Sequence, residues 1–280
     1  MPGACLPLLI SVPHGGLEVP PEVSNYCRLD LPALLKDGDT WAGYLYNMED
    51  LVQAFFQFPV ARAVIDPNRA ADDRPPGNPD GVVKTVTASN EQVWQKPEGL
   101  STAQVELLLE SYYYPYHRYL AVASENRKIL LGLDCHTMLD RAPQFSDCPG
   151  EQRPLVCLSN RGDENGEALD EHVTAPPDLL RSLGQILERN LIDLARGKSV
   201  PAVLLNRPFK GGYIIKHHGT FGHVPWIQVE FNRSLYLDSD PRKVAPGKEE
   251  IKRINKLKKC FFFALEELLL YKKEWENYLV

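Results

Sequence analysis

Short apolar runs alternate along the chain with longer segments of helical periodicity. The apolar runs predict buried strands at residues 6–12, 58–65, 129–135, 154–158, 202–205 and 227–231, of which 154–158 carries the weakest signal. The periodic segments predict helices over residues 40–56, 101–126, 178–196 and 248–279. Asp39 is placed to cap the first helix, and Ser101 with Gln104 forms a capping box for the second. Strands alternating with helices predict a layered α/β fold with a mostly parallel sheet.

Composition narrows the classes of protein that this chain can represent. Of its 280 residues, 44% are hydrophobic and 24% charged, which is enough apolar material for a large core and argues against global disorder. The formal net charge of −6 makes nucleic acid a poor candidate partner. No apolar run reaches the length of a membrane span, and the first residues lack the pattern of a secretory signal. None of the six cysteines forms a CxxC pair. We therefore expect a reduced cytoplasmic protein with no membrane partner.

Histidines follow two of the predicted strands. His14 follows the strand at 6–12 after Pro13, and His136 comes immediately after the strand at 129–135. Because side chains alternate along a strand, Asp134 and His136 should share a face, and a carboxylate beside a histidine commonly orients it for a metal. The two imidazoles could hold a zinc ion at the edge where parallel strands end. The alternative for His14 is a loop histidine that only caps a turn. The alternative for His136 is a buried histidine whose hydrogen bond goes to a backbone carbonyl.

A carboxylate lies within the last predicted strand. Gln228 and Glu230 alternate with apolar neighbours, so both should face the same layer. An isolated buried carboxylate is costly, so Glu230 should be either paired or functional. The functional interpretation is a general base. The alternative is an ion pair with Arg233 or another cation.

Asn68 and Arg69 follow the strand predicted at 58–65. The guanidinium group of arginine offers a fork of donors that matches a carboxylate, and an asparagine beside it can add another donor. The pair could therefore anchor a substrate carboxylate. The alternative is a surface Arg69 that pairs with Asp72 or Asp73. Histidines, a buried glutamate and an Asn-Arg pair together indicate metal-assisted hydrolysis of an amide that carries a carboxylate.

Ordered short motifs resemble those of the N-formylglutamate amidohydrolase family. They are Pro13-His14-x-Gly16-x-x-x-Pro20, Asp37-x-Asp39, Asp66-x-Asn68-Arg69, Pro115-Tyr116-His117, Asp134-x-His136-Thr137, Phe209-Lys210-Gly211-Gly212-Tyr213 running to His217, and Gln228-x-Glu230 followed by Tyr236. That family is in turn similar to the zinc carboxypeptidase superfamily. The resemblance implies one domain over residues 1–280, with three αβα layers and a mixed, mostly parallel central sheet.

The resemblance also implies residue roles. Asn68 and Arg69 match the segment that binds a substrate carboxylate, His136 matches a metal ligand, and Glu230 matches the catalytic base. Carboxypeptidases carry a metal-binding glutamate three residues after the first histidine, where this chain has Leu17. The third ligand would then be Asp39, whose other possible role is the helix cap, or Glu18.

The implied activity is zinc-dependent hydrolysis of an N-formyl or N-acyl amino acid, in which a metal-activated water attacks the amide and Glu230 acts as general base. Lys210, His117 and His217 are further candidates for substrate contact, although a solvated lysine and packed histidines are the simpler interpretations. Two other functions remain open: a carboxypeptidase-like hydrolase of a peptide or cell-wall fragment, and a binding protein without catalysis. The expected partner is a small molecule, and the chain would be a monomer or a small homo-oligomer.

Overall fold

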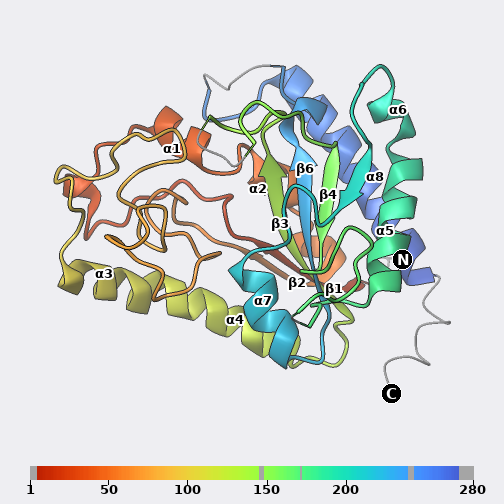
Figure 1. The fold of residues 1–280 in the computed structure, drawn as a ribbon, viewed down its shortest axis with the longest axis horizontal. Coiled ribbons are helices and arrows are strands. Elements are labelled where there is room, and N and C mark those ends of the chain that lie inside the picture. Colours follow the sequence, from red (N-terminus) through yellow and green to blue (C-terminus); the bar gives the residue numbers. More distant parts are fainter. Residues whose placement is uncertain (1–4, 145–147, 171, 239–242, 271–280) are drawn as a thin grey trace.

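The computed structural model describes residues 5–144, 148–170, 172–238 and 243–270, and Figure 1 shows how their elements are arranged. The strands are β1 Leu6–Val12, β2 Val52–Gln57, β3 Leu131–Met138, β4 Val156–Ser159, β5 Val203–Leu205 and β6 Trp226–Asn232. The α-helices are α1 Leu31–Asp37, α2 Ala42–Tyr46, α3 Thr102–Leu108, α4 Tyr114–Ser124, α5 Pro177–Asn190, α6 Ile192–Ala195, α7 Tyr213–Phe221 and α8 Lys248–Leu270.

The strands form a mixed sheet in the order β2-β1-β3-β6-β4-β5. Neighbours pair in parallel except β4, which runs antiparallel to β6. Every residue of β3 and β6 is buried, as expected for central strands covered on both faces. The carboxyl ends of β1, β3 and β6 therefore meet at one edge, and the start of β4 lies at that same edge.

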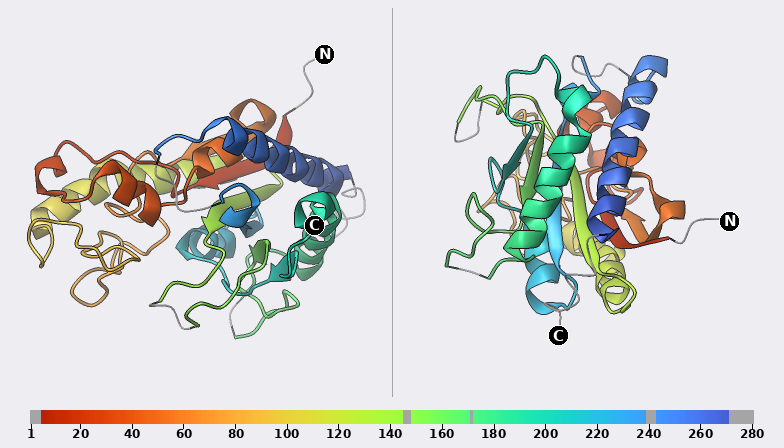
Figure 2. Two further views of the ribbon diagram at one scale, coloured as in Figure 1. Left: turned by 90° about the horizontal axis from the view of Figure 1, so that it is seen from above. Right: turned by 90° about the vertical axis from the view of Figure 1, so that its right-hand side faces the viewer.

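Helices cover both faces of the sheet, which confirms the predicted three layers. Leu8, Ile10 and Val12 of β1 pack with α2, α5 and α8, whereas Leu9 points to the layer of α3, α4 and α7. Helices α5 and α8 run side by side over the first face (Figure 2). Within the described residues, no helix combines the length and apolar character that a membrane crossing requires.

The predictions for residues 40–65 are wrong. Helix α2 covers only Ala42–Tyr46, and Val52–Gln57 forms β2 in parallel pairing with β1. Residues 58–65 are mostly buried, but apart from an isolated bridge between Val60 and Glu18 they form a turn and irregular backbone instead of a strand. A short apolar run signals burial without specifying backbone conformation, and pairing with β1 decides it here. Asn68 and Arg69 thus follow a turn.

The other predicted elements are largely present. The segment at 101–126 contains α3, a π-helical turn and α4, with the Ser101–Gln104 capping box formed. The helix predicted over 178–196 is divided into α5 and α6, and residues 271–279 of the predicted terminal helix lie outside the described residues. Helices α1 and α7 were not predicted. The two glycines of the motif Phe209-Lys210-Gly211-Gly212 precede α7, and Gly212 is its N-cap.

Candidate active site

Polar side chains from β3 and β6 stand in register at the carboxyl edge of the sheet. His136 lies opposite Glu230, and Asp134 lies opposite Gln228. Asp134 Oδ2 is 3.0 Å from His136 Nε2, and Gln228 Nε2 donates to Glu230 Oε1 at 3.1 Å. These contacts confirm that each pair shares a face, as strand alternation predicted.

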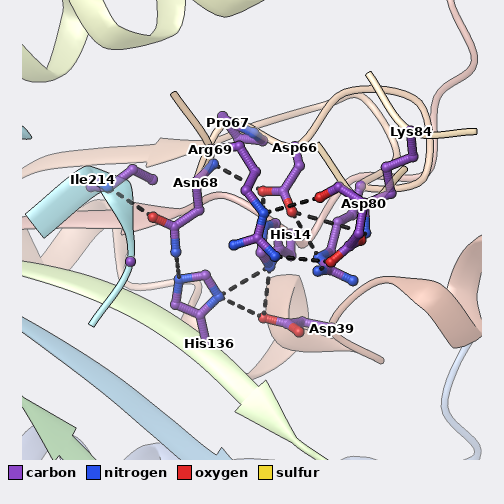
Figure 3. Close-up of polar contacts among 12 residues, drawn as sticks. His14, Asp39, Asp66, Pro67, Asn68, Arg69, Asp80, Lys84, His136 and Ile214 are labelled. Carbon is purple, nitrogen blue, oxygen red and sulfur yellow. Dashed lines mark hydrogen bonds and ion pairs between the residues drawn. The ribbon is translucent and has the colours of Figure 1, made fainter. Parts of the chain in front are cut away.

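Three possible ligand atoms converge beside this row (Figure 3). His136 Nδ1 is 3.1 Å from His14 Nδ1 and 3.1 Å from Asp39 Oδ2, while His14 Nδ1 and Asp39 Oδ2 are 3.7 Å apart. A tetrahedral zinc ion with ligands at ~2.0–2.1 Å requires separations of about 3.3 Å between ligand atoms. His14, Asp39 and His136 therefore fit a single divalent cation, and three protein ligands leave a coordination position for substrate or water.

A carboxylate behind each imidazole orients it toward this point. Asp66 Oδ1 is 2.8 Å from His14 Nε2, and Asp134 Oδ2 is 3.0 Å from His136 Nε2. When each Nε2 donates its proton to its carboxylate, both Nδ1 atoms are left as acceptors that face each other. Burial lowers the pKa of His136, but Asp134 and Asp39 outweigh it and raise that pKa well above its usual value. The arrangement therefore stabilises positive charge at this point.

Asp39 does not act as a helix cap. Residue Trp41 is the N-cap of α2, and only the main-chain oxygen of Asp39 accepts from the helix. The Asp39 carboxylate instead accepts from the Thr137 backbone at 3.1 Å and from Arg233 Nη2 at 3.3 Å. Burial opposes its ionisation, but His136 and His14 hold its pKa below the usual range. Glu18, the alternative third ligand, is exposed and is not part of the cluster.

Glu230 is buried and has no ion pair with Arg233, whose guanidinium binds Asp39 and backbone oxygens instead. Gly212 N–H donates to Gln228 Oε1 at 2.7 Å, which orients the Gln228 amide so that its Nε2 donates to Glu230 Oε1. Burial raises the pKa of Glu230 to about 7; the charge of His136 opposes that rise, and Asp39 adds to it. A carboxylate with this pKa can accept and return a proton near neutral pH.

An ion cluster behind His14 was not predicted from the sequence. Lys84 is completely buried, and its Nζ lies 2.5 Å from Asp80 and 3.5 Å from Asp37. Arg62 Nε is 3.2 Å from Asp66 Oδ2. Burial alone would raise the pKa of Asp66, but His14, Arg62 and Lys84 hold it well below its usual range. The only local signal was a single lysine inside the apolar segment 82–86.

A cavity of about 370 Å³ opens in front of these groups and is lined by His14, Asp39, His136 and Glu230. Asn68, Arg69 and Lys210 also line it. Arg69 Nη2 binds Asp80 at 2.9 Å, while its Nε is 4.0 Å from Asp73, one of the two partners considered from the sequence. Its side chain is 34% exposed, so one side of the guanidinium remains accessible.

Asn68 is held by its neighbours at the cavity wall. Its Oδ1 accepts from Ile214 N–H at 2.8 Å, at the start of α7, and its Nδ2 lies 3.2 Å from His136 Nε2. A Cβ atom on Gly212 would come within 2.3 Å of Asn68 Nδ2, so only glycine allows this close approach. This contact explains the glycine at position 212.

His117 and His217 are not among the residues that line the cavity. His117 Nε2 contacts the Pro67 oxygen at 3.0 Å and its Nδ1 contacts His218 Nε2 at 3.0 Å, so it supports the Asp66–Arg69 segment from behind. Burial and the neighbouring histidines lower the pKa of His117 to about 3, which keeps it neutral. His217 is exposed and contacts Tyr213.

Comparison with known proteins shows which family the chain belongs to. The family profile described as N-formylglutamate amidohydrolase matches residues 6–237, which include all the residues of the site. The chain belongs to the N-formylglutamate amidohydrolase family. It is therefore a hydrolase of carbon–nitrogen bonds other than peptide bonds.

An N-formylglutamate deformylase of Pseudomonas putida is 27% identical over 241 residues, covering 83% of this chain and 82% of that protein. The deformylase of Pseudomonas aeruginosa is also 27% identical over 241 residues, with 83% of each covered.

Solved structures show the same fold. An N-formylglutamate amidohydrolase from Ralstonia eutropha JMP134 superposes with a TM-score of 0.72 over 95% of both chains, at 21% identity. A protein from Agrobacterium tumefaciens superposes with a TM-score of 0.58 over 93% of this chain and 89% of its own, at 13% identity. These similarities confirm the predicted α/β fold.

Proposed function

We propose that this protein hydrolyses the formamide bond of an N-formyl amino acid, releasing formate and the free amino acid, with N-formyl-L-glutamate as the first candidate substrate. One observation carries the proposal: a buried Glu230 faces the same cavity as the converging His14, Asp39 and His136. The names of the deformylase relatives support the choice of acyl group and amino acid. We also propose that residues 1–280 form one amidohydrolase domain, because residues from both ends of the described chain contribute to one sheet and its layers.

His14, Asp39 and His136 would hold one divalent metal, with zinc the best match to two imidazoles and a carboxylate. Such an ion supplies Lewis-acid activation of a carbonyl and lowers the pKa of water. Asp66 and Asp134 fix the tautomers of the two histidines, and Arg233 holds the Asp39 carboxylate in place. These contacts keep the cluster in one geometry before any ligand binds.

Glu230 would move the proton. Its carboxylate takes a proton from the water that attacks the formyl carbon and delivers it to the nitrogen as the C–N bond breaks. The products are formate and the amine of the amino acid. Gln228 fixes one oxygen of Glu230 and leaves the other free to contact the water. Arg69 and Asn68 would hold the α-carboxylate, which orients the formamide for attack.

Formate release tests this function directly. The purified protein is loaded with zinc and incubated with N-formyl-L-glutamate, N-acetyl-L-glutamate and a peptide with a C-terminal glutamate, and products are followed by NMR. Formate from the first substrate is the expected result. Release of the C-terminal residue from the peptide, without formate from N-formyl-L-glutamate, would instead support a carboxypeptidase-like activity.

The substitution Arg69→Lys is expected to lower kcat/KM for N-formyl amino acids by about 10- to 100-fold, because a point charge cannot reproduce two parallel hydrogen bonds to a carboxylate. The matching α-amides lack that carboxylate, so their slow hydrolysis should change little. Zinc content should stay the same. Equal losses on acids and amides would show that Arg69 serves the fold through Asp80.

A further inference from the structure

Arg153 is a cation in the cavity wall whose guanidinium has no carboxylate partner among the described residues. The residue is 9% exposed and its Nε is buried without a hydrogen-bond acceptor. Its backbone is fixed, since its N–H donates to Asp140 at 2.9 Å and its oxygen accepts from Asn232 at 3.3 Å. Burying an uncompensated charge is costly. A ligand anion in the cavity would supply the missing partner.

The other guanidinium groups in the wall differ from Arg153 because each has a carboxylate partner. The pairs are Arg62 with Asp66 at 3.2 Å, Arg69 with Asp80 at 2.9 Å and Arg233 with Asp39 at 3.3 Å. Lys36 and Lys210 also line the cavity, but both are exposed to solvent. Arg153 thus combines burial with the absence of an ion pair within the described part of the chain.

The fold places Arg153 beside the row of polar side chains that includes His136 and Glu230. Strand β4 runs antiparallel to β6, with Val156 opposite Phe231 and Cys157 opposite Glu230. Arg153 precedes β4, so it lies at the carboxyl end of β6, next to Glu230. The sheet order then places His14, His136, Glu230 and Arg153 in succession across the edge. Arg69 belongs to the His14 end of this row through its contact with Asp80 and the ion cluster.

Phe209 fixes the orientation of the Arg153 side chain. The guanidinium carbon lies 4.9 Å from the centre of the Phe209 ring, and Phe209 also lines the cavity. Contact with an aromatic face occupies one side of the guanidinium plane and leaves its N–H edges available. Burial lowers the pKa of Arg153, and the charge of Glu230 opposes that shift only in part. The side chain is therefore held ready to donate two parallel hydrogen bonds.

We propose that Arg153 binds the side-chain carboxylate of the substrate and so selects acidic N-formyl amino acids over neutral ones. The inference rests on the proposed function and names the residue that sets its specificity. With the formamide at Glu230 and the α-carboxylate at Arg69, the side chain of the amino acid extends along the row toward Arg153. Two cationic receptors on opposite sides of the reaction centre match the two carboxylates of an N-formyl dicarboxylic amino acid.

The test compares N-formyl-L-glutamate with N-formyl-L-glutamine, which has nearly the same shape but no side-chain charge. The substitution Arg153→Met is expected to lower kcat/KM for the glutamate substrate by about 10- to 100-fold, the usual worth of a charged hydrogen-bonded contact. For the glutamine substrate the change should stay within about twofold. Arg207→Met is the matched control, because Arg207 is exposed on the loop before α7 and does not line the cavity. It should leave both substrates unaffected.

The second variant, Arg153→Lys, keeps the charge and protects the test against a failure of Arg153→Met to fold. It should show a smaller loss that is again confined to the glutamate substrate. Equal losses on both substrates would overturn the inference and assign Arg153 to the support of Glu230. Losses that disappear with the α-amide of N-formyl-L-glutamate would overturn it too, by assigning Arg153 to the α-carboxylate. If wild-type protein releases no formate from any N-formyl amino acid, the proposed function itself fails, and the inference with it.

Discussion

Glu230→Gln is expected to slow turnover of N-formyl-L-glutamate by about 10²- to 10⁴-fold, the usual contribution of a positioned acid–base group. Glutamine keeps the shape of the side chain and can still contact Gln228, but it cannot accept the proton of the attacking water. Zinc content and substrate KM should therefore stay close to the wild-type values. The measurement is kcat from formate release beside metal analysis of the same preparation.

An exposed acid provides the control for this substitution. Glu167 pairs with Arg181 and is not among the residues that line the cavity, so Glu167→Gln should leave kcat unchanged. Near-normal turnover of Glu230→Gln would contradict the assignment of Glu230 as the base.

The pH dependence of the wild-type enzyme follows from the same residue. Glu230 must be ionised to act as a base, and burial raises its pKa to about 7. A cation bound by the neighbouring cluster would lower that pKa, so kcat/KM should fall with decreasing pH at or below about pH 7. The loss occurs on the acid side because protonation removes the base.

His136→Ala is expected to weaken zinc binding by more than about 100-fold. Loss of a residue that only hydrogen-bonds to a metal ligand costs about 10- to 100-fold in affinity, and loss of the ligand itself should cost more. Formate release should fall with the metal content. Because a histidine side chain is removed from a polar cluster at the edge of the sheet, the protein should still fold, which circular dichroism can check. Zinc titration by equilibrium dialysis is the decisive measurement, since it does not depend on activity.

Two further variants give this experiment a graded scale. Asp134→Asn removes only the carboxylate behind His136, so it should weaken zinc binding by about 10- to 100-fold. His217→Ala removes an exposed histidine outside the cavity lining and should have no effect. Full zinc occupancy in His136→Ala would contradict the ligand assignment.

Local pattern predicted much of the sheet and of the row of polar side chains on β3 and β6. Alternation along β3 and β6 predicted which side chains share a face, and the structure confirms this for Asp134 with His136 and for Gln228 with Glu230. Alternation is a property of the extended backbone itself, so it can be read without knowing the neighbouring strands. The order of the short motifs was enough to identify the family.

The error at residues 52–57 and the open role of Asp39 both lie where a distant segment decides the outcome. Residues 52–57 have apolar spacing that also fits a helix, and only pairing with β1 makes them a strand. The role of Asp39 was open because its carboxylate could cap a nearby helix or meet a histidine 97 residues away. Local spacing cannot distinguish the helix cap from the contact with the histidine, because either one gives the Asp39 carboxylate a hydrogen-bond donor.

The sequence by itself determined the α/β class, the candidate base and the two histidines, because strand periodicity and residue chemistry are local properties. Only the tertiary structure decided that Asp66 stands behind His14 and that Lys84 is buried among carboxylates. It also decided that Arg153 lacks a carboxylate partner within the described residues. Whether a buried charge is compensated depends on which side chains meet after folding. The charged residues concerned come from loops and from the segment before an antiparallel strand, and no local pattern specifies where these lie.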